Sequence, residues 1–341
     1  MSGPGDAHHD TAHLVPSEGG EWRTVHTGAE TKVIAVVGAS GFIGSAAAHA
    51  LQMRGFHVHK LRAPRLPDIP KRELTEFIQS ADAPVRELVR ELRGAAAVVN
   101  AAGVPDAGSR RASQLIPANA ALPGIVARAA MQAKVPRFVH VSSAAVQGNK
   151  PVLDATMEVR PFSPYSLSKV LGEYSATTFY NGAVIYRPGG VHGAERKVTA
   201  LVFRLARSRL ALVAAPGTAT TPQALIQNVA DAVAYLATCS AQPPPIVAHP
   251  SEDLTTFGLM ATLGGRPPTV IPVQLANLIQ RVLTFAERVI PEVRPSLRRV
   301  ELIMYGQGQA ESWLSVSGWV TPVDLRGWKD LTSTLCEIRS N

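Results

Sequence analysis

KVIAVVGASGFIG, residues 32–44, joins an apolar run to three evenly spaced glycines. The run at 32–38 is rich in β-branched residues, which is typical of a strand buried on both faces. The small residues that follow, up to Leu51, predict a helix. The stretch therefore predicts a strand, a loop and a helix in succession, which is how alternating α/β folds begin.

The three glycines indicate an anion site. Glycine permits a tight turn and a close approach of the backbone to a pyrophosphate, and the helix N-terminus offers N–H groups to the anion. The spacing differs from the usual G-x-G-x-x-G pattern, and plain turn glycines are the alternative. The strand–loop–helix context favours a dinucleotide site, for which we expect these residues: Gly38, Ser40, Gly41, Phe42, Ile43 and Gly44.

Strand and helix patterns alternate as far as residue 194 and loosen afterwards. Such alternation implies right-handed crossovers and a doubly wound parallel sheet, the Rossmann fold, within an α/β protein. We expect further strands at 56–62, 95–103, 137–143 and 183–189, and helices at 123–135 and 164–180. The predicted organisation is a disordered tail (1–30), a dinucleotide-binding domain (31–194, with a returning segment at about 222–250) and a smaller C-terminal substrate-binding domain (195–221 and 251–341).

The run from Val273 to Ile290 carries apolar residues at helical spacing. Such a helix could dock on a membrane. Its polar face is mixed, however, which favours a core-facing helix of the smaller domain.

Composition limits the function classes. The 341 residues are 46% hydrophobic and 18% charged, as in an ordinary globular protein. Cys239 and Cys336 lie far apart without metal or redox spacing, which suits a reducing cytosol and predicts no metal site. We expect no membrane span and no secretory signal, hence a cytoplasmic protein.

The net charge of +8 is concentrated at residues 195–210 and 294–300. No nucleic-acid motif accompanies it, so we expect no nucleic-acid partner. A solvated basic face and attraction to an anionic membrane are alternatives, but we favour steering of a diphosphate-bearing substrate.

The expected second strand lacks the carboxylate that binds the adenosine ribose of NAD, about 20 residues beyond the glycines. Lys60, Leu61 and Arg62 occupy this place, with Arg65 just beyond. A guanidinium binds a 2′-phosphate through two hydrogen bonds, so Arg62 favours NADP(H) over NAD. A plain surface arginine is the alternative.

Tyr165 and Lys169, in the segment PYSLSK, lie four residues apart on one predicted helix and therefore on one face. Ser163 is expected to cap this helix, with Pro164 at its first position. A cation close to a phenol favours the phenolate. Tyr165 could then exchange a proton with a substrate oxygen while a hydride moves to or from a nicotinamide.

Five segments in order, GASGFIG, NAAG, VSSAAVQG, PYSLSK and YRPGGVHG, resemble the extended short-chain dehydrogenase/reductase family. The C-terminal segments TPQALIQNVADAVAYL and SGWVTPVDLRGWKDL look like its nucleotide-sugar epimerase and 4-keto-reductase branch, the NAD-dependent epimerase/dehydratase group. The resemblance covers residues 32 to about 330. It implies an NAD(P)-binding Rossmann domain, a smaller domain over the substrate, and a nucleotide sugar as that substrate.

The resemblance implies roles for residues at the family's motif positions. Tyr165 would be the acid/base, Lys169 would bind the nicotinamide ribose, and Ser143 would position the reacting oxygen. Besides this pair, the implied cofactor-binding residues outside the glycine loop and Arg62 are Ala101, Ala102, Gly103, Asn119 and Pro188. The residues expected to bind substrate are Ser143, Gln147, His192 and Arg196.

Departures from the family pattern bear on the reaction. Gln147 and His192 replace tyrosines, which leaves the exact substrate open, and Asn228 replaces a common aspartate. Dehydratases of the family usually carry Asp-Glu after the catalytic hydroxyl residue, whereas Ala144 and Ala145 follow Ser143 here. Dehydration is therefore disfavoured.

Several alternatives remain. A 4-epimerase would keep NAD tightly bound, whereas a 4-keto-reductase would consume free NADPH. A reductase of a non-sugar ketone and a non-catalytic dinucleotide sensor are rival classes, although the chain retains both Tyr165 and Lys169. The sequence also leaves open whether the protein forms a homodimer.

Overall fold

The computed structural model describes residues 12–16, 22–26, 32–105, 115–289 and 294–340. The chain forms two units, Met1–Lys32 and Val33–Asn341. In the first, strand β1 (Ala12–Pro16) pairs antiparallel with β2 (Trp22–His26), in a region where the sequence predicts a disordered tail.

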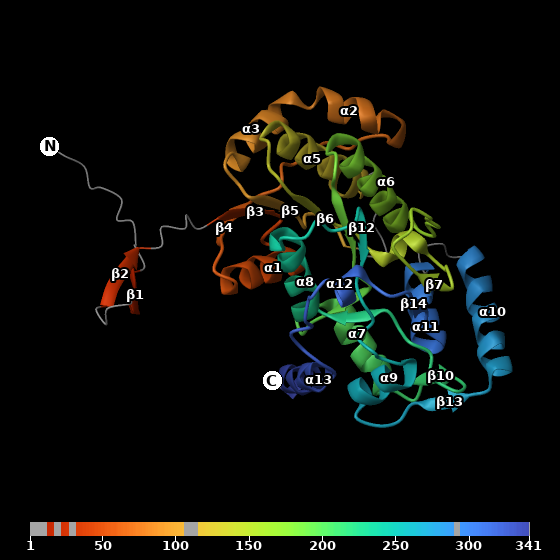
Figure 1. The fold of residues 1–341 in the computed structure, drawn as a ribbon. Helices are drawn as coiled ribbons and strands as arrows, with labels where there is room; N and C mark the ends of the chain where they lie inside the picture. Colours follow the sequence, from red (N-terminus) through yellow and green to blue (C-terminus); the bar gives the residue numbers. More distant parts are fainter. Residues whose placement is uncertain (1–11, 17–21, 27–31, 106–114, 290–293, 341) are drawn as a thin grey trace. The chain divides into compact units, whose positions relative to one another are not determined.

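A six-stranded parallel sheet forms the centre of the second unit, as Figure 1 shows. Its spatial order is β12-β8-β6-β5-β3-β4, and every pairing is parallel. The strands are β3 (Val33–Val37), β4 (His57–Leu61), β5 (Ala97–Asn100), β6 (Phe138–Val141), β8 (Val184–Arg187) and β12 (Ile246–Ala248). The predicted doubly wound parallel sheet is confirmed.

Two helical layers enclose this sheet, which explains why its strands are apolar throughout. In β3, Ile34 and Val36 pack into the core on one face, and Ala35 and Val37 into the core on the other. Helices α1 (Phe42–Met53) and α8 (Ile226–Thr238) cover the first face (Figure 1). The second is covered by α2 (Leu74–Ser80), α3 (Asp82–Leu92), α5 (Leu122–Gln132) and α6 (Pro164–Phe179).

The sheet changes winding direction at β3. This strand pairs with β4 on one side and with β5 on the other, so the loops after β3 and β5 leave the same edge as neighbours. Ligands of doubly wound folds bind at such a switch point. Strand β4 ends the sheet, and residues 62–70 after it form no strand or helix.

The elements after β8 build a second, smaller group of helices and short strands. They are β9 (Gly190–His192), α7 (Lys197–Ala206), β10 (Leu212–Ala214), β11 (Gln223–Leu225), α9 (Thr256–Gly264), β13 (Thr269–Ile271), α10 (Val273–Val289), α11 (Arg294–Tyr305), β14 (Gly308–Gln309), α12 (Trp313–Val316) and α13 (Arg326–Ser340). Phe203, Leu259 and Trp328 lie in its main core. Strands β10 and β13 pair in parallel, as do β9 with β11 and β14 with β7 (Val152–Leu153). Because Val33–Asn341 forms one compact unit, its division into two domains stays a prediction.

The apolar side chains of helix α10 do not all point to the core, although the sequence predicts that they do. The sequence predicts that its apolar face turns to the core, but Leu275, Leu278 and Val282 are exposed. Ala276 is buried instead, and Ile279 is half-buried against the same small core. Apolar residues therefore occur on both the inner and the outer side of α10, and the prediction is wrong for the outer ones.

Candidate active site

Helix α6 carries the predicted Tyr165–Lys169 pair and begins where the sequence indicates. The Ser163 side chain accepts a hydrogen bond from the Ser166 amide at 3.1 Å, and the Ser166 hydroxyl accepts one from the Ser163 amide at 2.9 Å. This capping box, with Pro164 in the first turn, fixes the start of the helix. The predicted cap is confirmed, and Tyr165 and Lys169 lie in the first two turns.

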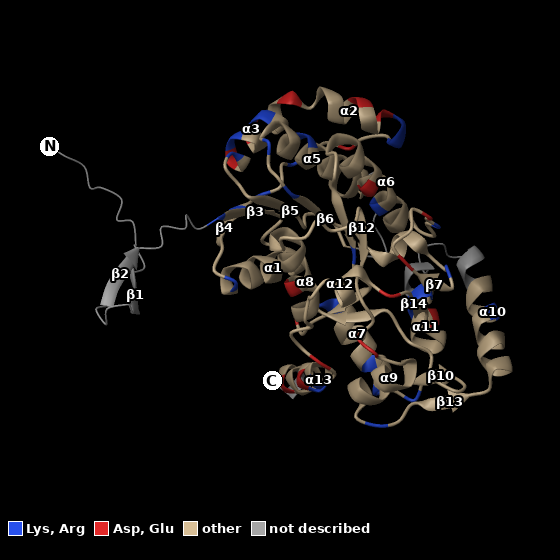
Figure 2. Ribbon diagram, in the orientation of Figure 1, with Lys and Arg blue, Asp and Glu red and all other residues tan. Residues whose placement is uncertain are grey.

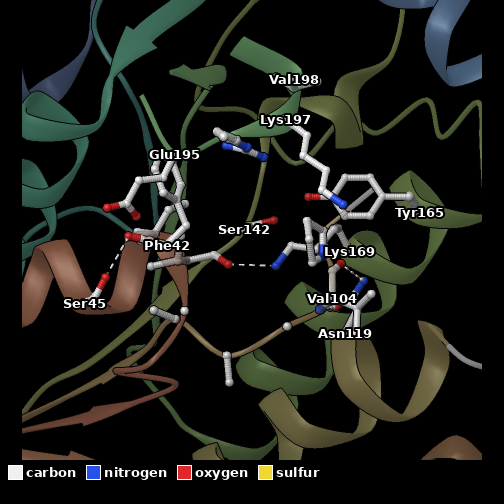
Figure 3. A pocket seen from close by; sticks show the side chains of 18 of the residues that line it. Phe42, Ser45, Val104, Asn119, Ser142, Tyr165, Lys169, Glu195, Lys197 and Val198 are labelled. Carbon is white, nitrogen blue, oxygen red and sulfur yellow. Dashed lines mark hydrogen bonds between the residues drawn. The ribbon is translucent and has the colours of Figure 1, made fainter. Parts of the chain in front are cut away.

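Both residues line a cavity of about 780 Å³ (Figure 3). Its walls come from the glycine loop, the loop after β5, the end of β6, α6, the N-terminal part of α7 and α11. The predicted residues that line it are Ser40, Gly41, Phe42, Ile43, Ala101, Ala102, Gly103, Asn119, Tyr165, Lys169 and Arg196. Segments far apart in the sequence thus form one site.

The glycine loop fits the phosphate-bearing part of a dinucleotide. A Cβ at Gly38 would lie 2.6 Å from the Ala102 backbone, and one at Gly44 would lie 2.1 Å from the Gly38 carbonyl oxygen. Gly38 also has a φ of +84°, which favours glycine. Gly41 caps α1 without a side-chain hydrogen bond, so no side chain competes with an anion for this N-terminus.

Lys169 is a buried cation at the floor of the cavity. Its ammonium donates a hydrogen bond to the Val141 carbonyl oxygen at 2.7 Å. Burial lowers its pKa from 10.5 to about 8, and the nearby Glu173 carboxylate opposes this shift. Burial also lowers the pKa of the neighbouring His140 well below 6.5, and the charge on Lys169 lowers it further. The lysine is therefore still cationic at neutral pH, beside a neutral imidazole.

A buried ion pair lies behind this lysine. Arg187 holds Glu173 through two hydrogen bonds, Nε to Oε1 at 2.9 Å and Nη2 to Oε2 at 2.7 Å. The Ser142 hydroxyl donates to the same Oε1 at 2.5 Å. Because both carboxylate oxygens are engaged, Glu173 is fixed in position near Lys169.

The two adjacent serines at the end of β6 differ in their bonding. Ser142 lines the cavity, but it has one hydroxyl proton and donates it to Glu173. Ser143 caps the short helix Ala144–Gln147, and its oxygen accepts a hydrogen bond from the Ala145 amide at 3.2 Å. That bond leaves the Ser143 proton for another acceptor. Ser143 is not among the residues that line the cavity.

Asn119 joins the loop after β5 to α6. Its side chain accepts from the Val104 amide at 2.8 Å and donates to the Val104 carbonyl at 3.1 Å. The same amide nitrogen lies 3.0 Å from the Ser168 hydroxyl on α6. One buried side chain thus positions the cavity wall at Val104 relative to Tyr165 and Lys169.

Comparisons with known proteins identify the family. The model of the NAD dependent epimerase/dehydratase family matches residues 34–247. The chain belongs to this family. The prediction of an NAD(P)-dependent enzyme of the short-chain dehydrogenase/reductase type is thereby confirmed. A search of curated proteins finds no match.

Solved structures of this family share the fold. UDP-glucuronic acid 4-epimerase from Bacillus cereus, in complex with NAD, is 19% identical with a TM-score of 0.60, over 90% of this chain and 99% of that one. dTDP-4-dehydrorhamnose reductase from Bacillus anthracis, in complex with NADP, is 15% identical with a TM-score of 0.60, over 89% and 99%. MoeE5, in complex with UDP-glucose and NAD, is 20% identical with a TM-score of 0.57, over 90% and 99%.

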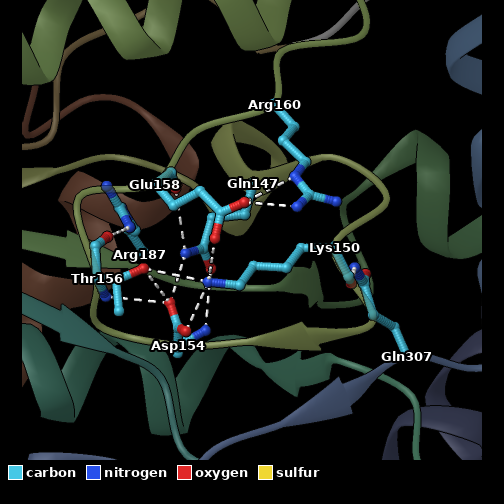
Figure 4. Close-up of polar contacts among 8 residues, drawn as sticks. All are labelled: Gln147, Lys150, Asp154, Thr156, Glu158, Arg160, Arg187 and Gln307. Atoms are coloured by element: carbon cyan, nitrogen blue, oxygen red, sulfur yellow. Dashed lines mark hydrogen bonds and ion pairs between the residues drawn. The ribbon is translucent and has the colours of Figure 1, made fainter.

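Besides Ser143, two of the family-derived substrate residues lie outside the cavity lining. Gln147 is buried in a polar cluster, where its amide donates to Asp154 Oδ1 at 2.7 Å and accepts from the Asp154 amide at 3.0 Å (Figure 4). Burial alone would raise the pKa of Asp154, but hydrogen bonds from Lys150, Thr156 and Gln147 lower it well below its usual value. Gln147 therefore stabilises the loop that it belongs to.

His192 is the second of these expected substrate residues outside the cavity lining. It contacts Gln223 at 2.8 Å and Thr199 at 3.2 Å, and it packs against Trp328. Burial lowers its pKa to about 4, so it is neutral at physiological pH. His192 is thus part of the core.

Four predicted cofactor residues also lie outside the cavity lining: Gly38 and Gly44, which shape the glycine loop, and Arg62 and Pro188. Arg62 is exposed directly after β4, where Leu61 accepts a hydrogen bond from the Gly38 amide at 3.1 Å. Arg62 is therefore next to the glycine loop along the sheet edge. Pro188 is buried, and its carbonyl accepts from the Ala144 amide at 2.8 Å.

The cavity contains charged residues that sequence reasoning did not identify. Glu195 and Lys197 flank Arg196, and Arg299 comes from α11. In Figure 3 the Lys197 side chain extends toward Tyr165. The basic runs at 195–210 and 294–300 were the only signal for them, because nothing local shows that the two runs meet at one cavity.

Proposed function

We propose that this enzyme transfers hydride at a ring carbon of a nucleotide-activated sugar, as a 4-epimerase or a 4-keto-reductase. Its family membership and its cavity support this proposal. The cavity combines a proton-transfer pair, Tyr165 and Lys169, with a glycine loop that fits a dinucleotide. That combination carries the proposal.

The charges on the opposite wall support a diphosphate-bearing substrate. Arg196, Lys197 and Arg299 line the cavity on the side of α7 and α11. The Arg196 guanidinium lies 5.2 Å from the ring centre of Phe42, which holds it beside the glycine loop. Guanidinium and ammonium groups are the side chains that bind phosphate oxygens. A reductase of an apolar ketone would have no use for three such cations.

The residues divide the chemistry between them. A bound nicotinamide supplies the hydride acceptor or donor. Tyr165 takes the proton of the substrate hydroxyl as that carbon becomes a carbonyl, and returns it in the reverse direction. The Lys169 cation favours the phenolate form of Tyr165. Ser143 adjoins the lining residue Ser142, and its proton is not used in its bond to Ala145, so we assign to it the hydrogen bond to the reacting oxygen.

Purified protein tests this proposal directly. We expect the cofactor released on denaturation to identify the reaction type: stoichiometric NAD supports a 4-epimerase, and an empty site that accepts NADPH supports a reductase. Turnover is then measured with UDP- and dTDP-sugars and with an apolar ketone as the control. Turnover of the ketone alone would contradict a nucleotide-sugar substrate.

We further propose that Arg62 favours NADP(H). Replacing Arg62 by alanine is expected to raise the dissociation constant for NADP⁺ about tenfold, because an ion pair with the 2′-phosphate is lost. NAD binding should change by less than about twofold, since NAD carries no 2′-phosphate. Calorimetry with both cofactors measures the effect, and Arg90→Ala, at an exposed arginine on α3, is the control. Tighter binding of NAD than of NADP⁺ by the unsubstituted protein would remove this role.

A further inference from the structure

A stripe of large apolar side chains runs along the outer side of α10. Leu275, Leu278, Val282 and Phe285 expose 45%, 57%, 62% and 66% of their surface. Their spacing of three, four and three residues places them on one side of the helix. We call these four residues the α10 stripe.

The inner side of α10 is already packed. Ala276 is fully buried, and Ile279 is half-buried in the core that α10 shares with β10 and α11. The helix is therefore held in place by its inner residues. The α10 stripe is not needed for that packing, and it consists of side-chain types that are normally withdrawn from water.

The chain segments that carry the stripe and the adjoining strand β10 are basic. Residues 196–230 and 254–286 contain no aspartate or glutamate. Of their seven basic residues, Arg196 and Lys197 line the cavity, and the other five are Arg204, Arg207, Arg209, Arg266 and Arg281. Figure 2 shows no acidic residue on β10, α9 or β13, and residues 273–285 of α10 contain none. Arg281 is exposed and adjoins Val282.

We propose that the α10 stripe docks this enzyme on an anionic phospholipid surface. A helix that lies in a membrane interface inserts large apolar side chains, while neighbouring arginines extend their heads to the phosphates. Basic residues near the helix add attraction to anionic lipids. The stripe supplies the first feature, and Arg281 with the acid-free segments supplies the second.

Binding of this kind is peripheral. No helix among the described residues is long and apolar enough to cross a membrane. Because the inner side of α10 is packed against the protein, only the outer stripe enters the lipid. The site is separate from the cavity, so the proposal does not depend on which reaction the enzyme performs.

A second copy of the chain is a less suitable partner for the α10 stripe than an anionic lipid surface. Pairing two α10 stripes would bring two cationic surfaces together. The part of α10 that carries the stripe, residues 275–285, contains no carboxylate to pair with Arg281 of the other copy. Like charges at such an interface oppose association, whereas an anionic lipid surface complements them.

Vesicle sedimentation with the full chain tests the proposal. We expect binding to phosphatidylcholine–phosphatidylglycerol vesicles, and weaker binding to phosphatidylcholine alone or at high salt. The double variant Leu278→Gln/Phe285→Gln should lower the partition coefficient by about tenfold or more, because two apolar anchors are lost. Arg281→Gln should lower it about fivefold on the anionic vesicles alone. Met53→Gln, at a residue that is 75% exposed on α1, is the control and should change nothing.

Two results would overturn the proposal. One is equal vesicle binding by the unsubstituted protein and the double variant, or no binding by either. The other is a dimer, measured by light scattering, that the double variant converts to a monomer; the stripe would then be an interface between copies. Thermal unfolding of each variant establishes that it folds, so loss of binding is attributable to the surface.

Discussion

Tyr165→Phe is expected to lower kcat by about 10³-fold while the cofactor stays bound, because proton transfer by a positioned side chain contributes about 10²–10⁴-fold. The substitution removes one oxygen and keeps the ring that packs in the cavity wall. The substrate should therefore bind as before, and the fall in kcat reflects a slower chemical step. Turnover of the accepted nucleotide sugar and the cofactor content of the purified protein are the two measurements.

The same helix provides the control for this experiment. Tyr174 is also on α6 but is 58% exposed, so Tyr174→Phe should leave both turnover and cofactor content unchanged. Undiminished turnover of Tyr165→Phe would exclude Tyr165 as the proton carrier. Loss of the cofactor would mean that the hydroxyl is needed for binding as well as for chemistry.

Lys169→Met is expected to abolish turnover and, at neutral pH, to stabilise the fold. The buried ammonium has a pKa of about 8 instead of 10.5, so keeping it charged at pH 7 costs about 3 kcal/mol. Methionine fills a similar volume without this cost. The lost hydrogen bond to the Val141 carbonyl offsets part of the gain, and we expect a net increase in unfolding free energy of about 1–2 kcal/mol.

The sign of the pH dependence follows from the same pKa. Between about pH 8 and 10.5 the unfolded chain holds the Lys169 proton and the folded chain has lost it. The unsubstituted protein therefore gains stability, from this group, as the pH rises through that range. The difference between Lys169→Met and the unsubstituted protein should be largest below pH 8 and should shrink toward pH 10.5.

Denaturant titrations at pH 7 and pH 10 measure this difference, and the comparison between proteins cancels the other titrating groups. Lys329→Met, at an exposed lysine on α13, is the matched control and should alter stability little at either pH. A destabilised Lys169→Met at pH 7 would show that the ammonium contributes more through its contacts than its burial costs.

The sheet was predictable from the sequence because its signals are local. A strand covered on both faces is apolar along its length, so segments such as 32–38 are recognisable without knowledge of their neighbours. The capped start of α6 is likewise encoded within four residues, Ser163 to Ser166. Motif order then located the glycine loop, Tyr165 and Lys169, all of which reach one cavity.

The rest of the site depends on contacts between distant segments. Position within a family motif suggests that Gln147 faces a substrate, but its partner Asp154 holds it in another cluster. The role of Ser142 follows from Glu173, which is 31 residues away in the sequence. For α10, helical periodicity identifies apolar residues without showing which side the protein covers, so the core-facing prediction was wrong for Leu278.

The outer position of β4 limits how the sheet can grow. A terminal strand leaves unpaired N–H and C=O groups that can recruit a strand from another molecule, the route to edge-to-edge aggregation. The chain beyond β4 has prolines at 64, 67 and 70, and a proline lacks the N–H that a ladder requires. This segment cannot serve as a seventh strand or as a regular template for one. The exposed Lys60 adds a charge that would have to be buried in such a pairing, so both features disfavour polymerisation through the β4 edge of the sheet.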